Sequence, residues 1–317
     1  MSIRRMALGS WPADYGSPAG DDALIDTTTV VDTDLEVGGA AWRPLTAKCP
    51  PAKNVWFIDG VRRMEARIWL TVDDGTTLPG LAASWAAGAV RCDGAAVITD
   101  CRVERGLFSN ADDRLGLDTG IDGIGVFAAC HAQSAGDAGL RNALQAAMRG
   151  TEHDIAREAG RSGELVLTDG PLRVRVHGRM VGYIKTQHVA YLSPALQATV
   201  ERLAVGQRTP LFLTASQSWK HYSWYLRLQD GGSHPWEAMV RCETLADGVD
   251  VADAARLADE VAVTLPRFAS HAHRDARAPQ NLYPIGALER HLRHRLGDAT
   301  VINRHLRRAV AVAGVSG

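Results

Sequence analysis

The sequence predicts an α/β fold in which a mixed sheet is flanked by helices. Its 317 residues are 46% hydrophobic and 22% charged, which is the composition of a soluble globular chain with a sizeable core. Strand-like runs come first, and amphipathic helical patterns alternate with further strands after them, as in a mixed α/β domain. The length accommodates either one large domain with insertions or two small ones.

Residues 1–50 predict an N-terminal arm. They are rich in Gly, Pro, Asp and Thr and carry only short apolar patches, which is typical of an extended segment. One strand is predicted inside the arm, at 29–31. We expect the main domain to occupy residues 51–300 and a C-terminal tail to occupy residues 301–317.

Three successive strands are predicted where the main domain begins. The apolar run at 55–58 stops at Asp59 and Gly60, which is the pattern of a buried strand that meets a turn. The runs at 63–72 and 81–90 follow with turn signals between them, as in an antiparallel meander.

An amphipathic helix is predicted over residues 138–160. Leu140, Leu144, Met148 and Ile155 recur there at steps that place them on one face of a helix. The remaining predicted elements are strands at 165–170 and 181–185, a helix at 193–205, strands at 211–228 and 237–243, and a helix at 284–296.

Charge and cysteine content narrow the class of protein. Lys plus Arg number 35 and Asp plus Glu number 36, so no overall positive field draws the chain to nucleic acid, and such contact needs a local patch. The five cysteines contain no C-x-x-C pair, which argues against a disulfide framework or a zinc ribbon. With no secretory signal and no apolar run of membrane-spanning length, we expect a soluble cytoplasmic protein with no membrane partner.

Two apolar runs each deliver an aspartate at the end of a strand. Asp59 follows the first run and Asp169 follows the run at 165–168. If the strands pair, their backbones lie about 4.8 Å apart, and carboxylates at that spacing repel unless a cation lies between them. Glu152 is the third candidate, because it shares the inward side of its helix with Met148 and Ile155.

Each of these acids also has an ordinary interpretation. A strand-terminal Asp-Gly is most often only a turn, and Asp100 shows how readily the pattern arises. Three other glutamates are interpreted as solvated carboxylates: Glu104, Glu158 and Glu164.

The combination and order of these motifs resemble those of the NurA nuclease family over about residues 53–298. The most specific piece is a Tyr-Pro pair with a histidine eight residues after the tyrosine, which places both side chains at one cleft if the proline begins a helix. The motifs are FIDG with Asp59, Arg62 and Arg63; Glu152 on a helix; LVLTDGPL with Asp169; VGYIK with Lys185; and YPIGALERH with Tyr283 and His291.

The resemblance implies a ribonuclease-H-like fold and a nuclease that cuts DNA with Mn²⁺ or Mg²⁺, through two ions. It also implies a partner, the HerA-type hexameric ATPase that drives DNA into the nuclease, and we expect a homodimer. The chain itself contains no Walker A motif, so any ATP dependence comes from such a partner.

Carried over position by position, the resemblance gives each motif residue a role. The metal ligands are Asp59, Glu152, Asp169 and His291, and the aromatic neighbour of the site is Tyr283. By their position beside the predicted site, Lys185 is expected to hold a scissile phosphate and Arg62 and Arg63 to contact the DNA backbone, although the two arginines also fit surface charges. The family usually has serine after each Asp-Gly, whereas this chain has Val61 and Pro171. The family's Glu-Leu-Pro segment is also altered here, so we interpret Glu243 as structural.

Several alternatives stay open from the sequence. Lys185 also fits an edge-strand lysine that discourages aggregation, and the arginine-rich segment 290–308 fits either a DNA channel or a solvated helix face. Aromatic residues between Trp219 and Tyr225 fit core packing better than base stacking, and the histidines around His271 form no zinc signature. Two other functions compete with the nuclease: a catalytically silent adaptor that binds DNA or an ATPase, and a metal-dependent hydrolase of small phosphate esters.

Overall fold

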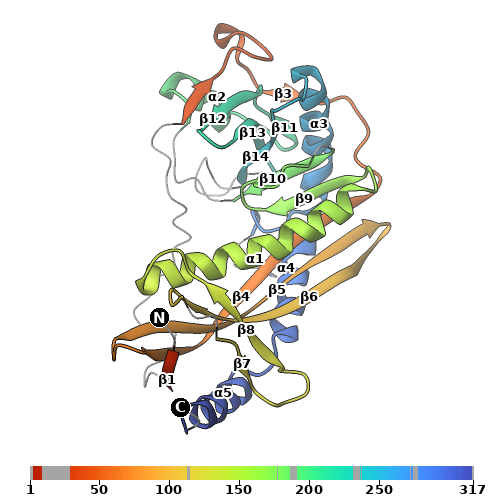
Figure 1. The fold of residues 1–317 in the computed structure, drawn as a ribbon. Coiled ribbons are helices and arrows are strands. Elements are labelled where there is room, and N and C mark those ends of the chain that lie inside the picture. The colour runs from red at the N-terminus through yellow and green to blue at the C-terminus, as the bar shows by residue number, and fades with distance from the viewer. Residues whose placement is uncertain are drawn as a thin grey trace.

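One large mixed sheet with helices on both of its faces organises the chain (Figure 1). The structure is a computed structural model and describes residues 3–8, 29–112, 115–176, 178–185, 191–230, 236, 238–271, 273 and 278–315. Within these residues the strands are β1 (Ile3–Leu8), β2 (Val30–Asp32), β3 (Leu45–Thr46), β4 (Val55–Val72), β5 (Thr77–Asp93), β6 (Ala95–Ser109), β7 (Leu117–Asp118), β8 (Val126–His131), β9 (Leu165–Asp169), β10 (Met180–Ile184), β11 (Gln207–Arg208), β12 (Phe212–Ala215), β13 (Lys220–Arg227) and β14 (Met239–Leu245). The helices are η1 (Gly39–Ala41), α1 (Gly136–Gly160), α2 (Pro194–Glu201), α3 (Val251–Thr264), η2 (Leu265–Phe268), α4 (Tyr283–Arg295) and α5 (Ala299–Val315).

The strand order explains the mixed character of the sheet. Its main path runs β2-β12-β13-β14-β10-β9-β4-β5-β6-β8-β7. β9 is parallel to both β4 and β10, whereas β4, β5 and β6 form antiparallel pairs. The prediction of an α/β protein with a mixed sheet flanked by helices is therefore confirmed at that level.

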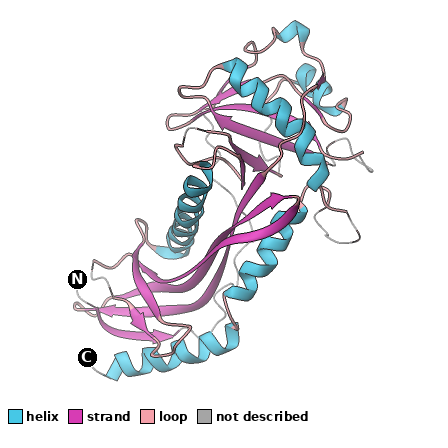
Figure 2. Ribbon diagram, turned by 90° about the vertical axis from the view of Figure 1, so that its right-hand side faces the viewer, coloured by secondary structure: helices cyan, strands magenta, loops and turns pink. Residues whose placement is uncertain are grey.

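β4 is much longer than the sequence indicated. The expected turn at Asp59 and Gly60 is wrong, because β4 continues through both residues, which pair with Gly88 and Ala87 of β5. What ends near Asp59 is the pairing with β9, whose register with β4 covers Val55 to Ile58. Beyond that point the long strands β4, β5 and β6 extend as a curved, twisted ribbon (Figure 2).

The two faces of the sheet hold different helices. Phe57 belongs to the core cluster that contains α3 and α4, and Ile58 belongs to the cluster that contains α1. Successive side chains of a strand point to opposite faces, so this alternation places α1 opposite α4. Figure 1 shows the same arrangement, with α1 crossing in front of the sheet and α4 behind it.

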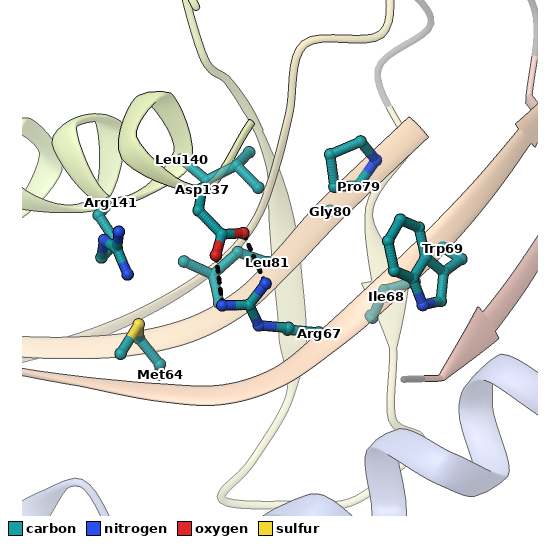
Figure 3. A pocket seen from close by; sticks show the side chains of 10 residues that line it. All are labelled: Met64, Arg67, Ile68, Trp69, Pro79, Gly80, Leu81, Asp137, Leu140 and Arg141. Carbon is teal, nitrogen blue, oxygen red and sulfur yellow. Dashed lines mark hydrogen bonds and ion pairs between the residues drawn. The ribbon is translucent and has the colours of Figure 1, made fainter. Parts of the chain in front are cut away.

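The beginning of α1 is fastened to the long ribbon by an ion pair. Arg67 of β4 donates to both carboxylate oxygens of Asp137, with Nη1 2.6 Å from Oδ1 (Figure 3). Asp137 lies in the first turn of α1, where a negative charge also complements the helix dipole. The pair lies in a shallow pocket lined by Trp69, Pro79 and neighbouring residues of the ribbon.

The predicted arm and tail both contribute regular structure. β1 pairs with β4, β2 with β12 and β3 with β11, so parts of residues 1–50 belong to the sheet; residues 9–28 of the predicted arm lie outside the described residues. The predicted tail is helix α5, whose Ile302, Leu306 and Val310 are buried against Leu70 and Phe127. Its apolar positions recur at four-residue steps, the same signal that identified α1.

The aromatic residues of β13 are buried. Tyr222, Trp224 and Tyr225 all lie in the core, which confirms that the aromatic run packs in the core. Trp219 lies between the guanidinium of Arg175, 4.7 Å from its ring centroid, and the ring of His221.

No described helix has the length and apolar character needed to cross a lipid bilayer.

Glu164 is not the solvated carboxylate that we expected. It accepts hydrogen bonds from Arg91, Asn54 and Trp56 at 2.6 to 2.9 Å, and these contacts tie the start of β9 to β4 and β5. The Arg91 guanidinium is the main cause that lowers the pKa of Glu164 to about 2.

We predict that Glu164→Gln destabilises the protein and that the effect depends on pH. Because the pKa is lowered on folding, the carboxylate stabilises the fold fully above its ordinary value of about 4.5, and this contribution is lost as pH falls towards 2. Urea unfolding of both proteins between pH 3 and pH 7 measures it. A stability difference that stays constant or grows below pH 4.5 would contradict the prediction.

Candidate metal centre

The site forms at the point where β9 separates from β4. Ile58 and Thr168 are the last residues paired between these parallel strands, and Asp59 and Asp169 follow them directly. The expectation that the two aspartates lie on neighbouring strands is confirmed. Both side chains are therefore positioned by backbone that is buried in the sheet, since Phe57, Ile58 and Leu167 are at most 1% exposed.

Three carboxylates converge at this point. Oxygen atoms of Asp59, Asp169 and Glu289 all lie within 4.8 Å of one another, and Asp59 and Glu289 are each only 6% exposed. Oδ1 of Asp59 accepts a hydrogen bond from the backbone N–H of Gly60 at 2.8 Å. Its Oδ2 is buried and has no hydrogen-bond partner among the residues that the structure describes. A buried carboxylate oxygen without a partner is costly, so the arrangement favours a bound cation.

The surroundings of Asp59 oppose its ionisation. Burial raises the pKa of Asp59 well above its usual range, and the carboxylates of Asp169, Glu152 and Glu289 raise it further. Lys185 acts in the opposite direction but does not cancel these effects. A divalent cation among the oxygens would reverse the balance by favouring the charged form.

Glu152 approaches the site from the opposite face of the sheet. It is half-buried on α1 between the buried Met148 and Ile155, as the sequence predicted. Its carboxylate lies against the backbone of Gly60, where an added Cβ would be only 2.4 Å from Oε1. Glu152 thus acts electrostatically on Asp59, although it is outside the set of three whose oxygens lie within 4.8 Å.

Lys185 is part of the site rather than an edge-strand residue. It directly follows β10, which is an interior strand between β9 and β14. Its ammonium donates to Oδ2 of Asp169 at 2.6 Å and to Oδ1 of the buried Asn281 at 2.9 Å. Lys185 thus balances the charge of Asp169, whereas Oδ2 of Asp59 accepts no hydrogen bond from the described residues.

Glu289 was missed in the sequence interpretation, although a signal for it existed. It lies on the apolar side of α4 with Ile285, Leu288 and Leu292, all of them buried. An acid within an apolar helical stripe is the same criterion that identified Glu152. Arg293, one turn further along, is its ion-pair partner, with Nη2 3.3 Å from Oε2.

His291 does not join the carboxylate set, contrary to the expected ligand arrangement. It is half-buried on α4 two residues after Glu289, and two residues correspond to a rotation of about 200° around the helix. Among the described residues, the histidine's predicted place beside the aspartates is occupied by Glu289.

Tyr283 begins α4, as the motif predicted, and contacts a histidine. Its hydroxyl is 2.7 Å from Nδ1 of His271, and the two rings are stacked with centroids 5.9 Å apart. Asn281, which holds Lys185, lies only two residues before it, so the start of α4 faces the site.

The arginines after Asp59 have different environments. Arg63 donates to the carbonyls of Leu296 and Gly297 beyond α4 and to Glu65, so its guanidinium stabilises a helix end. Arg63 therefore has a structural role in the fold, and its contact with DNA stays a prediction. Arg62 is exposed.

Glu243 has the structural role that the sequence suggested. Its buried carboxylate is paired with Arg241 at 2.6 Å and accepts a hydrogen bond from the N–H of Leu172 at 2.9 Å. These contacts fix the segment that follows Asp169 against β14.

The possible donor atoms of the cluster are all carboxylate oxygens. All three clustered ligands are carboxylates, and hard cations such as Mg²⁺ and Mn²⁺ prefer oxygen, whereas zinc sites rely on histidine and cysteine. The buried acidic triad is thus able to bind a metal ion. No protein-family model matches the chain, and no curated protein matches it either.

We predict that Asp59→Asn stabilises the metal-free protein and abolishes stabilisation by metal. Asp59 has a raised pKa in the folded state, so its ionisation destabilises the fold as pH rises above the ordinary value of about 3.8. Removing the charge relieves this, and Tm is expected to rise by about 2–4 °C for each kcal/mol relieved. Thermal unfolding in EDTA and in Mn²⁺, at pH 5 and pH 8, measures both effects. Equal stabilisation of wild type and variant by Mn²⁺ would show that the ion binds elsewhere.

We also predict that Gly60→Ala weakens metal binding and leaves the fold intact. The new Cβ displaces the end of the flexible Glu152 side chain, and loss of such a supporting group costs about 10–100-fold in metal affinity. Calorimetric titration with Mn²⁺ measures it. Gly150→Ala is the matched control, because an added Cβ there meets nothing within 4 Å. Unchanged affinity in Gly60→Ala would remove Glu152 from the site.

Proposed function

We propose that this protein is a metal-dependent nuclease that hydrolyses phosphodiester bonds in DNA. The observation that carries the proposal is the partnerless buried Oδ2 of Asp59 within a cluster of carboxylate oxygens. Such a cluster is tolerable around a cation, and carboxylate-held Mg²⁺ or Mn²⁺ is a recurring device of phosphoryl-transfer sites.

We further propose that the fold is ribonuclease-H-like. The central strands run in the order β6-β5-β4-β9-β10, the first three antiparallel and β9 and β10 parallel to β4, with α1 between the two groups in the chain. Asp59 of β4, Asp169 of β9 and Glu152 of α1 have the distribution expected from the resemblance to the NurA family, and Glu289 of α4 is an addition to it.

The chain's own groups have distinct roles in this proposal. Two bound Mn²⁺ or Mg²⁺ ions would lower the pKa of a water and stabilise charge on the leaving oxygen. Asp59, Asp169 and Glu289 hold the cations, and Glu152 supports them from the other face. Lys185, 2.6 Å from Asp169, is placed to orient the scissile phosphate.

Two other functions were left open by the sequence. An adaptor without catalytic activity gains nothing from buried, mutually repelling carboxylates, so the site supports catalysis over that alternative. A small-molecule phosphoesterase would use the same cation chemistry, and the two are separated by substrate.

Purified protein is expected to degrade linear DNA in Mn²⁺ and to stop when EDTA is added. Asp59→Asn and Asp169→Asn should each lower the rate by at least about a hundredfold, because several kcal/mol of metal-derived stabilisation is lost. Asp253→Asn on α3 is the matched control, since it removes an exposed carboxylate paired only with Arg256. Full activity in both site variants, or hydrolysis of bis(4-nitrophenyl) phosphate without any DNA cleavage, would overturn the nuclease proposal.

A hexameric ATPase of the HerA type is the partner that we propose. The net charge of −1 gives weak electrostatic capture of DNA, and the chain has no Walker A motif to drive translocation. A translocase would supply DNA at high local concentration. The same cleavage assay with the ATPase and ATP is expected to run faster than with the nuclease alone. A homodimer and a cytoplasmic location also remain proposals.

A further inference from the structure

A stripe of basic side chains runs along α1, the helix that also carries Glu152. Arg149, His153 and Arg157 follow one another at four-residue steps, so they share one side of the helix. Arg149 is three residues before Glu152, which places it about 60° further round the helix and away from the core. Arg149 and His153 are half-buried and Arg157 is exposed. The stripe therefore adjoins the side of α1 from which Glu152 reaches the site.

A third arginine reaches the same side from the segment after Asp169. Leu172 and Val174 are buried in the core cluster that contains Ile155 and Ala159 of α1, so this segment lies along the helix. Inward and outward side chains alternate in it, and Arg173 is exposed between Leu172 and Val174. Only four residues separate it from Asp169. We call Arg149, His153, Arg157 and Arg173 the basic flank.

The members of the basic flank act on one another electrostatically. Arg149, Arg157 and Arg173 all act on the half-buried His153 between them, so these side chains lie near one another. Asp154 is 3.1 Å from Arg157 and offsets part of the positive charge of the three arginines. Mutually repelling cations on one surface are stabilised by a multivalent anion that neutralises several of them together.

We propose that the basic flank binds successive phosphates of a nucleic acid strand next to the metal centre. This inference rests on the proposed function and names the residues that hold the substrate. The axial distance from Arg149 to Arg157 is about 12 Å, which is long enough to reach more than one phosphate of a strand. A free phosphate would need only one or two of these cations, whereas an extended stripe suits a polyanion.

DNA binding measured without cleavage tests the inference. Fluorescence anisotropy of a labelled 30-nucleotide single strand in EDTA compares wild type with the double variant Arg149→Gln and Arg173→Gln. The variant is expected to bind at least tenfold more weakly, and its salt slope should fall by about 1.4, because two phosphate contacts are lost. Arg43→Gln is the control for the loss of one exposed positive charge and is compared with Arg149→Gln and Arg173→Gln singly, since Arg43 is an exposed arginine in the loop before β3. Replacement of both arginines by lysine keeps the charge and should retain most of the affinity.

The outcomes separate this inference from the proposed function. If wild type cuts DNA but the double variant binds it with unchanged affinity and salt slope, the basic flank is not the binding surface and the nuclease proposal stands. If binding depends on the flank but no DNA is cut in Mn²⁺, the flank inference stands and the nuclease proposal fails. An equal loss of affinity in Arg43→Gln would overturn the flank inference, because it would reflect net charge alone.

Discussion

The structure depends on bringing two helices, from opposite faces of one sheet, close enough for their acids to reach Asp59. Two glycines on neighbouring strands permit this. Gly60 leaves room for Glu152 of α1, and Gly88, which pairs with Asp59 across the ladder, leaves room for Leu288 and Leu292 of α4, each 3.1 Å from where a Cβ would stand. Because Glu289 lies between those leucines on α4, the close approach at Gly88 is what carries its carboxylate to the site.

The three clustered carboxylates differ in how their charges are balanced. Asp169 is neutralised by Lys185, which Asn281 holds in place, and Glu289 is paired with Arg293. Asp59 has its backbone fixed in the middle of the sheet and retains an oxygen without a partner. Packing of the sheet core therefore offsets the electrostatic repulsion between the clustered carboxylates, and this repulsion is largest at Asp59, the residue at the centre of the cluster.

The sequence was sufficient for the elements with strong patterns and for the acids at their ends. It identified α1, β9, β10 and α4, because their apolar spacing is regular, and it placed Asp59, Asp169 and Glu152 together. The predicted turn at Asp59 and Gly60 was wrong because a local signal competed with strand pairing. These two residues have the composition of a turn, but both pair with residues of β5, so β4 continues through them. The sequence analysis selected His291 instead of Glu289, because the motif contains the histidine. A motif does not show which side chains are buried, and burial distinguishes Glu289 from His291 in the structure.

A polyanion that approaches the acidic cluster is repelled by its carboxylates, and the basic flank is a local source of attraction. A metal-free cluster of carboxylates repels phosphate, and the net charge of the chain provides no general attraction to offset this. Cations must therefore lie close to the centre without neutralising it, and they must be held by elements that also hold the acids. α1 carries Glu152 together with Arg149 and Arg157, and β9 ends at Asp169, four residues before Arg173. In the proposed function, α1 and the end of β9 would set the distance between the bound phosphates and the carboxylates, so that strand binding and chemistry would share one rigid frame.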